Sequence, residues 1–353
     1  MNYNNYILII IVILIIIIVY RIIMKKYYEN FTMTHAAVPG DYEENKLTII
    51  NIPKIKVIYT PNILINWELD YIKYDIVIDK NIISKTINEI DTHFLENNKD
   101  LINSNIFVFS SNDTDTDTSY KKLNEIITTL KPLVIIHLSD EYGVKNIKYL
   151  QLSYKTKLYL RQYNFKDYNI SSYPNTYQIP LGYMVGMLKQ QSSIDRTDII
   201  PINERKYTWA FIGNMKQDRE ELIDKFKNNF NNYYFQKTDP NEIYNIYNNS
   251  IFVPNGRGNI TLDCLRLYEG ALAGAIPVIM GNIDEIKYTF DFNNNRPPFI
   301  YVETWDEAII KCKELLKNPK KLTEIQNNIL FWWNNIIKNI RMKIIEIISP
   351  PIK

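Results

Sequence analysis

The sequence has few of the residues that crosslink chains or bind soft metals. Only two cysteines, Cys264 and Cys312, occur in 353 residues, which excludes a disulfide framework and a zinc site. Three histidines exclude a histidine-rich metal centre. The net charge is only +2, so there is no electrostatic case for a nucleic-acid partner. These shortages direct attention to the apolar runs and the few glycines that the chain does contain.

One long hydrophobic run lies near the N-terminus. Residues 6–24 carry a single charge, Arg21, close to one end. A helix of this length, at about 1.5 Å per residue, nearly spans the hydrocarbon core, and Arg21 can reach the interface. A cleaved signal peptide would have a basic region before a shorter run. We therefore predict a transmembrane anchor at 6–24, followed by a polar stem at 25–53.

After the stem, short apolar runs alternate with helical patterns. The runs of strand length are at 56–60, 74–79, 105–110, 132–138, 157–163 and 176–183. Helical patterns at 82–96 and 120–130 separate some of them. This alternation predicts an α/β domain at 54–195, with a parallel sheet covered by helices on both faces. The polar, aperiodic stretch 190–203 predicts a linker.

A second alternation follows the linker and predicts another doubly wound domain at 205–330. Its strand patterns are at 207–214, 232–237, 250–254, 275–281 and 298–302, and its helical patterns at 217–230, 241–249, 261–273, 304–317 and 322–348. The C-terminal helix, assigned to 331–353, either packs back across the domain interface or lies on the surface of its own domain. Two such sheets predict a ligand site in the cleft that their carboxyl ends face.

The stretch 250–281 reads as strand, glycine loop, helix and strand. The loop contains Asn255, Gly256, Arg257 and Gly258, and its glycines permit backbone geometries closed to other residues. Thr261 is a candidate N-cap for the helix that follows. Free N–H groups at a helix start favour a bound phosphate, so we predict an anion site here.

The helix of this stretch carries two charged residues in an apolar context. Arg266 and Glu269 are three residues apart and share one helix face. A charged pair between two buried strands is costly without a partner. The pattern therefore favours ligand binding by Arg266 and Glu269 over an internal ion pair.

A second glycine turn lies at the start of the second domain. Gly213 and Asn214 follow a strand pattern, and Arg219 lies in the first turn of the next helix. An arginine there runs against the helix dipole, which makes better sense if an anion is bound nearby. The alternative is an exposed arginine paired with Asp218 or Glu220.

In the first domain, Asp140 and Glu141 follow the strand pattern at 132–138. A carboxylate at that position can take a proton from an attacking hydroxyl; the alternative is a helix cap made by Ser139 or Asp140. Arg161 is either a buried ion-pair partner or a cleft residue, and Tyr183 is predicted to line an acceptor site.

Residues 111–118 (SNDTDTDT) contain D-x-D twice. Such a motif after a strand binds a divalent cation in some transferases. That reading leaves the second domain unexplained, so a solvated acidic loop is favoured and no metal ligand is assigned.

These motifs resemble the exostosin-like glycosyltransferases. The resemblance is carried by 211–214 with Arg219, by 250–259 and by 265–281, and more loosely by 137–141, 159–163 and 179–183. The strand at 273–281 is also similar to one in fucosyltransferases. The resemblance implies a GT-B fold of two Rossmann-like domains, a nucleotide-sugar donor held by the second domain, and no required metal or other cofactor. It implies that Arg219, Arg257 and Arg266 face the diphosphate and that Glu269 faces the ribose.

We therefore expect a membrane-anchored, metal-independent, inverting glycosyltransferase with a glycan or glycoprotein acceptor. A UDP-sugar is the favoured donor. The alternatives are a fucosyltransferase that uses GDP-fucose and a non-catalytic, membrane-tethered sugar-binding protein. The expected location is the Golgi, the endoplasmic reticulum or another internal membrane. The positive charges of Arg21, Lys25 and Lys26 follow the span and favour a cytoplasmic body, whereas Golgi glycosyltransferases usually have the opposite orientation.

Overall fold

The computed structural model describes residues 55–61, 67–78, 82–138, 141, 147–165, 170–216 and 219–349, all within one compact unit. The predicted anchor at 6–24, the stem and Asp140 lie outside the described residues. Within the described ranges, no helix combines the length and the apolar character needed to cross a membrane.

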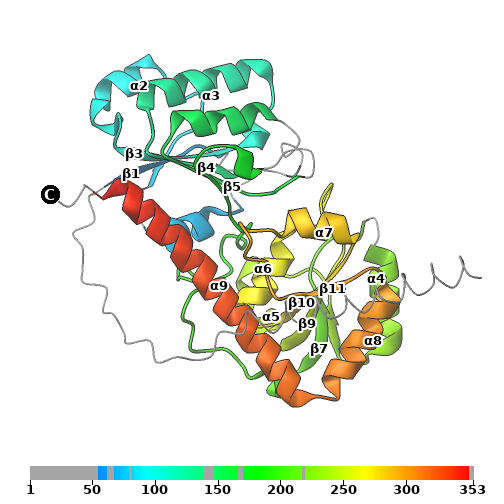
Figure 1. Ribbon diagram of the computed structural model, residues 1–353. Helices are drawn as coiled ribbons and strands as arrows, with labels where there is room; N and C mark the ends of the chain where they lie inside the picture. The colour runs from blue at the N-terminus through cyan, green and yellow to red at the C-terminus, as the bar shows by residue number, and fades with distance from the viewer. Residues whose placement is uncertain are drawn as a thin grey trace, which may run out of the picture. The chain divides into compact units, whose positions relative to one another are not determined.

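The first sheet contains six parallel strands in the order β2-β1-β3-β4-β5-β6. Figure 1 labels β1, β3, β4 and β5 of this sheet. Their bounds are β1 Lys56–Tyr59, β2 Ile82–Ser84, β3 Asn105–Ser110, β4 Val134–Leu138, β5 Leu158–Arg161 and β6 Thr176–Gln178. Every residue of β3, β4 and β5 is buried. Strands covered on both faces are continuous apolar runs, which explains why the sequence pattern finds them. We call residues 55–189, which carry this sheet, the N-lobe.

The second sheet contains five strands in the order β11-β10-β9-β7-β8, and all of its strand pairs are parallel. The bounds are β7 Tyr207–Phe211, β8 Tyr233–Phe235, β9 Ser250–Asn255, β10 Ile276–Met280 and β11 Ile300–Val302. We call residues 205–318 the C-lobe. The prediction of two parallel sheets is confirmed, and this is the arrangement that a GT-B fold has.

Helices connect the strands of both sheets. In the N-lobe the α-helices are α2 Thr92–Asn97 and α3 Asp117–Leu130. Other helical segments, of 3-10 or π type, are η2 Tyr71–Ile76, η3 Lys99–Leu101, η4 Ser111–Asp113, η6 Ile147–Lys155 and η7 Ile170–Ser172. After η8 Ile202–Glu204, the C-lobe contains α4 Arg219–Asn229, α5 Pro240–Asn248, α6 Leu265–Leu272, α7 Ile283–Thr289 and α8 Trp305–Leu316. The chain then continues into α9 Pro319–Ile348.

Two predicted elements near the start of the N-lobe are wrong. Residues 74–79 were expected as a strand, but Tyr71–Ile76 form the π-helix η2, whose residues Tyr71, Ile72 and Ile76 are buried. These three residues share one helical face. The predicted strand at 74–79 began after Tyr71 and Ile72, so it missed this helical spacing. The predicted helix at 82–96 begins as the edge strand β2, which pairs with β1, and only its end is helical, as α2.

The helix α6 begins later than predicted. Its first residue is Leu265 and its N-cap is Cys264, which makes no side-chain capping bond. Thr261 is therefore not the N-cap. The glycine loop runs on to Cys264, and this leaves the backbone N–H groups of residues 259–261 outside any helix.

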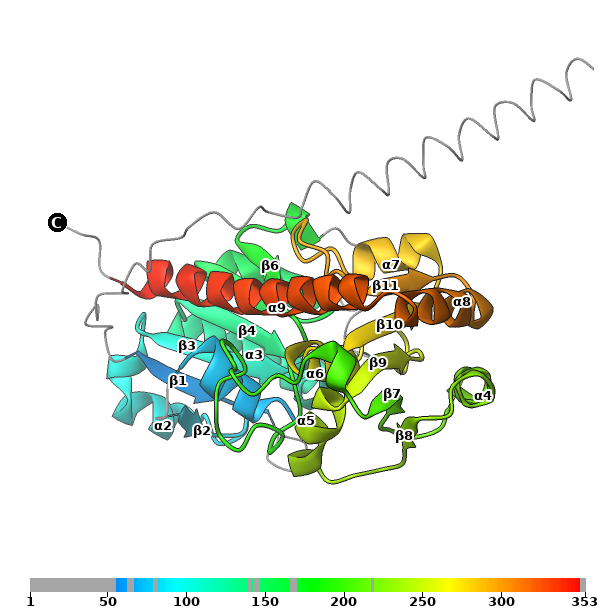
Figure 2. The same ribbon diagram turned by 90° about the horizontal axis from the view of Figure 1, so that it is seen from below.

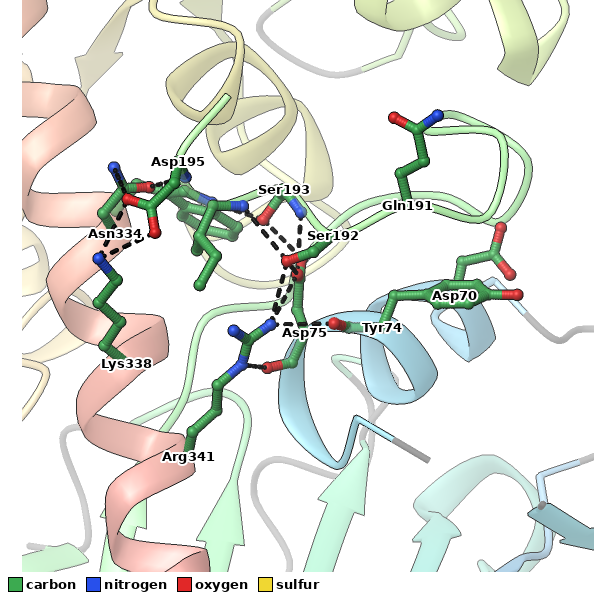
Figure 3. A network of polar contacts seen from close by, with 12 residues as sticks. Asp70, Tyr74, Asp75, Gln191, Ser192, Ser193, Asp195, Asn334, Lys338 and Arg341 are labelled. Atoms are coloured by element: carbon green, nitrogen blue, oxygen red, sulfur yellow. Dashed lines mark hydrogen bonds and ion pairs between the residues drawn. The ribbon is translucent and has the colours of Figure 1, made fainter. Parts of the chain in front are cut away.

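The helix α9 packs back across the interface between the lobes (Figure 2). Near its start, the Gln326 side chain accepts a hydrogen bond from Ile202 N–H at 3.0 Å. Near its end, Arg341 donates to the carbonyls of Tyr74 and Asp75 in η2, at 2.9 and 2.6 Å (Figure 3). The helix α9, Pro319–Ile348, agrees closely with the helical pattern predicted at 322–348 and starts before the bound of 331 assigned to the C-terminal segment, so it is long enough to reach both lobes.

Candidate functional site

A cavity of about 490 Å³ lies where the carboxyl ends of the two sheets meet. Ser110 and Leu138, at the ends of β3 and β4, line it from the N-lobe. Gly213, Gly258 and Arg266 line it from the C-lobe. The cavity is thus in the place where doubly wound sheets bind their ligands.

The Arg266 side chain lines the cavity and is held on several sides. Its Nε donates to Asn255 Oδ1 at 3.1 Å, and its guanidinium carbon lies 4.8 Å from the centre of the Phe211 ring. A Cβ on Gly213 would lie 2.7 Å from Arg266 Nη1, so glycine is required there for close approach. The side chain is only 9% exposed, and Nη2 is buried with no hydrogen-bond partner among the described residues.

Glu269 lies on the same face of α6 and contacts the other lobe. Its carboxylate accepts a hydrogen bond from Met184 N–H in the N-lobe at 3.1 Å. Burial raises the pKa of Glu269 to about 7. The carboxylate lines the cavity, and its contact with Met184 ties the two lobes together.

The glycine loop holds an anion, and that anion belongs to the chain itself. The Glu141 carboxylate accepts hydrogen bonds from the N–H groups of Ile260 and Thr261 and from the Thr261 hydroxyl, at 3.1, 3.0 and 3.0 Å. It also accepts one from Asn259 N–H. A Cβ on Gly258 would collide with the carboxylate. In this arrangement both Glu141 oxygens contact the loop, so neither is directed at an acceptor hydroxyl.

Arg219 and Arg257 differ in their relation to the cavity. Arg219 is buried and lines the cavity; it donates to the carbonyls of Asn214 and Arg257 at 2.6 and 2.8 Å. It thereby connects the turn at Gly213 with the loop at 255–258. Gly256, in that loop, is buried. Arg257 forms a two-pronged ion pair with Glu285 of α7, at 2.5 and 2.7 Å, and is not a cavity-lining residue.

The two residues predicted on the acceptor side are not in the cavity. Arg161 is 1% exposed and lies within β5, a strand that is buried throughout. Tyr183 is fully buried and packs edge-on against Tyr71, with 5.8 Å between ring centres. The chain after β6 turns inward at Gly182, whose φ is +83°, so Tyr183 enters the core. Neither residue is among those that line the cavity, and the burial of Arg161 agrees with the alternative of a buried ion-pair partner.

Sequence reasoning missed Asp263, which lies between the glycine loop and α6. Its Oδ1 accepts hydrogen bonds from Tyr268 Oη–H at 2.7 Å and from Cys264 N–H at 3.0 Å. Its Oδ2 is buried with no hydrogen-bond partner in the described structure. Burial, together with the Glu141 charge, raises the pKa of Asp263 to about 8. The sequence did offer a sign of this residue, because Asp263 is the one acid within the mainly apolar run ITLDCL at 260–265.

The two walls of the cavity differ in charge. On the C-lobe wall the basic residues are Lys216, Arg219, Lys237 and Arg266. The same wall contains two acids, Asp263 and Glu269, and burial raises the pKa of each, to about 8 and about 7. On the N-lobe wall the charged residues are Glu68, Asp113 and Glu141, and none of the described residues lining that wall is basic. Trp67, which is 52% exposed, lines the same wall. Because the C-lobe wall holds all the basic side chains among the described lining residues, we call it the basic half of the cavity and the N-lobe wall the acidic half.

Of the three aspartates in residues 111–118, Asp113 lines the cavity, whereas Asp115 and Asp117 are exposed. Within the described ranges, no group of three or more histidine, cysteine, aspartate or glutamate side chains is placed to hold a metal ion.

No protein-family model and no curated protein matches this chain. Solved structures do. One is a DNA-modifying β-glucosyltransferase, solved with and without uridine diphosphoglucose; it has 12% identity over 83% of this chain and 97% of that one, with a TM-score of 0.43. Another is an α-glucosyltransferase in complex with UDP-glucose and DNA, with 9% identity over 75% and 85% and a TM-score of 0.44. A third is a T4 phage BGT mutant in complex with UDP-glucose, with 15% identity over 84% and 99% and a TM-score of 0.41.

Proposed function

We propose that the protein is a glycosyltransferase that binds the diphosphate of a nucleotide sugar against the C-lobe wall of the cavity. The observation that carries this proposal is that Arg266 lines the cavity while its Nη2 is buried and has no hydrogen-bond partner among the described residues. An unpaired buried guanidinium N–H is costly, and an anion in the cavity would satisfy it.

The basic half of the cavity would stabilise the leaving group. When the bond between the sugar and the diphosphate breaks, negative charge grows on the phosphate oxygen. Arg266, with Lys216 and Lys237 on the same wall, would face that charge and stabilise it electrostatically. Interactions that strengthen in the transition state accelerate the reaction. This chemistry fits a metal-independent transfer, which we propose proceeds with inversion.

Glu269 is proposed to contact the ribose. Its carboxylate lines the cavity one turn of α6 from Arg266, and a carboxylate accepts hydrogen bonds from ribose hydroxyls. A UDP-sugar is the proposed donor and GDP-fucose its alternative. Assignment to the exostosin-like family rests on the sequence motifs alone.

The acidic half of the cavity is proposed to bind the acceptor. Carboxylates accept hydrogen bonds from sugar hydroxyls, and an exposed tryptophan offers an apolar face to a sugar ring. Glu68, Asp113 and Trp67 provide these groups. A glycan or glycoprotein hydroxyl fits this wall, whereas a nucleic-acid backbone would be repelled by it.

We also propose that residues 6–24 anchor the enzyme in an internal membrane, with the side of the body unassigned. Protease treatment of sealed microsomes would assign it. A protected body would lie in the lumen, and a digested body would lie in the cytoplasm.

Replacing Arg266 tests the proposed donor site. Arg266→Ala should weaken UDP binding by about 10- to 100-fold, because a hydrogen bond to a charged group contributes about 1.5–3 kcal/mol. Calorimetry with UDP and GDP measures this and names the nucleotide. Circular dichroism should be unchanged. Lys225→Ala is the control, because its ion pair with Asp306 lies outside the cavity lining and its loss should leave UDP affinity unchanged.

Equal nucleotide affinity in Arg266→Ala and in the wild type would contradict the proposed donor site. Nucleotide binding without release of sugar from any donor, in the presence of glycan acceptors, would instead favour the non-catalytic sugar-binding alternative.

A further inference from the structure

We infer that the loop segment Asn259–Thr261 is a second anion subsite, which the Glu141 carboxylate fills in this structure and which a donor phosphate takes from it. The inference rests on the proposed function, because it names the ligand as a phosphate of the same donor. It also gives Glu141 two positions, one on the loop and one released from it.

The first observation is the density of donors around one carboxylate. Three consecutive backbone N–H groups and the Thr261 hydroxyl all donate to Glu141. Successive N–H groups that converge on one point form a concave anion site, and such bonds to a charged acceptor are strong. A phosphate oxygen accepts hydrogen bonds from the same donors as a carboxylate oxygen does.

The second observation is that this loop and Arg266 face the same cavity. Glu141, Gly258, Asn259 and Arg266 all line it. Arg266 Nη2 is buried in a side chain that is only 9% exposed, and it has no partner among the described residues. The Lys216 ammonium, which contacts the Asn259 side chain, lies on the same wall. An anion that satisfies Arg266 therefore approaches the loop that Glu141 occupies.

The carboxylate and a phosphate cannot share these donors. Both carry negative charge, and like charges at hydrogen-bonding distance repel strongly in a buried site. Asp263 responds differently, because burial raises its pKa to about 8 and it carries a proton at pH 7. Its Oδ2, which lacks a partner among the described residues, can therefore donate to a phosphate. A bound phosphate would therefore displace the charged Glu141 carboxylate and leave the protonated Asp263 in place.

Displacement would couple donor binding to acceptor activation. Glu141 belongs to the N-lobe wall, where we propose that the acceptor binds, so its released carboxylate can accept the proton of the acceptor hydroxyl. The acceptor oxygen then forms a bond to the anomeric carbon. The bond from that carbon to the phosphate oxygen breaks, and the nucleoside diphosphate leaves with the electron pair. Before the donor binds, the loop holds this carboxylate.

Binding of inorganic pyrophosphate tests the inference by calorimetry on the full chain. Glu141→Ala and Glu141→Gln should each bind pyrophosphate at least about 5-fold more tightly than the wild type, because the competing carboxylate is gone. Both variants should transfer sugar more slowly. Glu221→Gln, which removes one exposed charge on α4, is the matched control and should leave pyrophosphate affinity unchanged.

A second variant tests the donors themselves. In the Glu141→Ala background, Thr261→Val should weaken pyrophosphate binding, because the hydroxyl that contacted Glu141 would then contact the anion. Unchanged or weaker pyrophosphate binding in both Glu141 variants would overturn the inference, since the carboxylate would then merely brace the loop. An equal effect of Glu221→Gln would overturn it too.

The proposed function and this inference are tested by different measurements, UDP binding for the first and pyrophosphate binding for the second. If Arg266→Ala abolishes UDP binding while the Glu141 variants gain no affinity for pyrophosphate, the donor site stands and the subsite is wrong. If the Glu141 variants gain affinity for pyrophosphate but no nucleotide binds, the subsite stands and the nucleotide-sugar assignment is wrong.

Discussion

Asp263 makes the stability of the protein depend on pH. Its carboxyl has a pKa of about 8 in the folded chain and an ordinary value of 3.8. Between these values, unfolding releases a proton that the folded state holds, so the stability from this group falls as pH rises through that window. The stability that the protonated Asp263 contributes is fully present below pH 3.8 and is lost above about pH 8.

We predict that Asp263→Asn is more stable than the wild type at pH 8.5 and nearly equal to it at pH 4. The amide keeps the acceptor for Tyr268 and Cys264 and removes the charge. One pKa unit corresponds to about 1.4 kcal/mol, so a gain of at least ~1 kcal/mol and roughly 2–4 °C in Tm is expected at pH 8.5. Thermal melts at both pH values measure this. Asp284→Asn, at an exposed position, is the control. A Tm difference that does not vary with pH would contradict the argument.

Single residues also show how far the sequence predicts this site. Arg266 and Glu269 could be selected because each is a charge inside an apolar helix, and the structure places both on the cavity wall. The contact between Glu141 and the loop could not be predicted, because it joins residues 118 or more positions apart and depends on how the lobes meet. Tyr183 was misplaced for a related reason: its turn into the core is set by packing against Tyr71.

At the scale of elements, burial decides which segments the sequence predicts. The strands β3, β4 and β5 are buried along their whole length and were predicted, since continuous apolar runs of strand length are distinctive. The edge strand β2 and the helix η2 were not. β2 is partly exposed and pairs on one side only. Its sequence therefore lacks the continuous apolar run that marks a buried strand.

The last turns of α9 hold a buried carboxylate of the N-lobe through Arg341 (Figure 3). Asp75 of η2 is buried, and its carboxylate accepts hydrogen bonds from Ser192 and Ser193. Arg341 of α9 supplies the cation, 3.3 Å away. Arg341→Met would leave the buried carboxylate without its counter-charge. We expect a loss of roughly 1–3 kcal/mol, measured by urea unfolding.

Lys338→Met provides the matched comparison on the same helix. Lys338 pairs with Asp195 at 3.0 Å, but both side chains are about half exposed. An exposed pair contributes little, so the loss should stay below about 0.5 kcal/mol. Similar losses in the two variants would show that burial of Asp75 is not what makes the α9 contact important.

At the scale of the whole molecule, the division of charge between the cavity walls orients the reaction. The C-lobe is basic where the diphosphate is proposed to lie, and the described N-lobe wall contains only acidic charges. An acceptor that carries carboxylate or sulfate groups must bring negative charge against Glu68, Asp113 and Glu141. Such repulsion is a common source of specificity between related ligands.

We therefore predict that neutral oligosaccharides are better acceptors than uronic-acid-containing or sulfated ones, by roughly 10-fold or more in kcat/KM, which corresponds to about 1.4 kcal/mol. Transfer assays at low salt, where exposed charges are least screened, measure the ratio. The double variant with Glu68→Gln and Asp113→Asn should bring the ratio closer to one, chiefly through the KM of the acidic acceptor. Asp284→Asn with Glu221→Gln, two exposed positions away from the cavity lining, should leave it unchanged. If acidic acceptors are used as well as neutral ones by the wild type, the N-lobe wall does not bind the acceptor, and the orientation of the two substrates must be reversed.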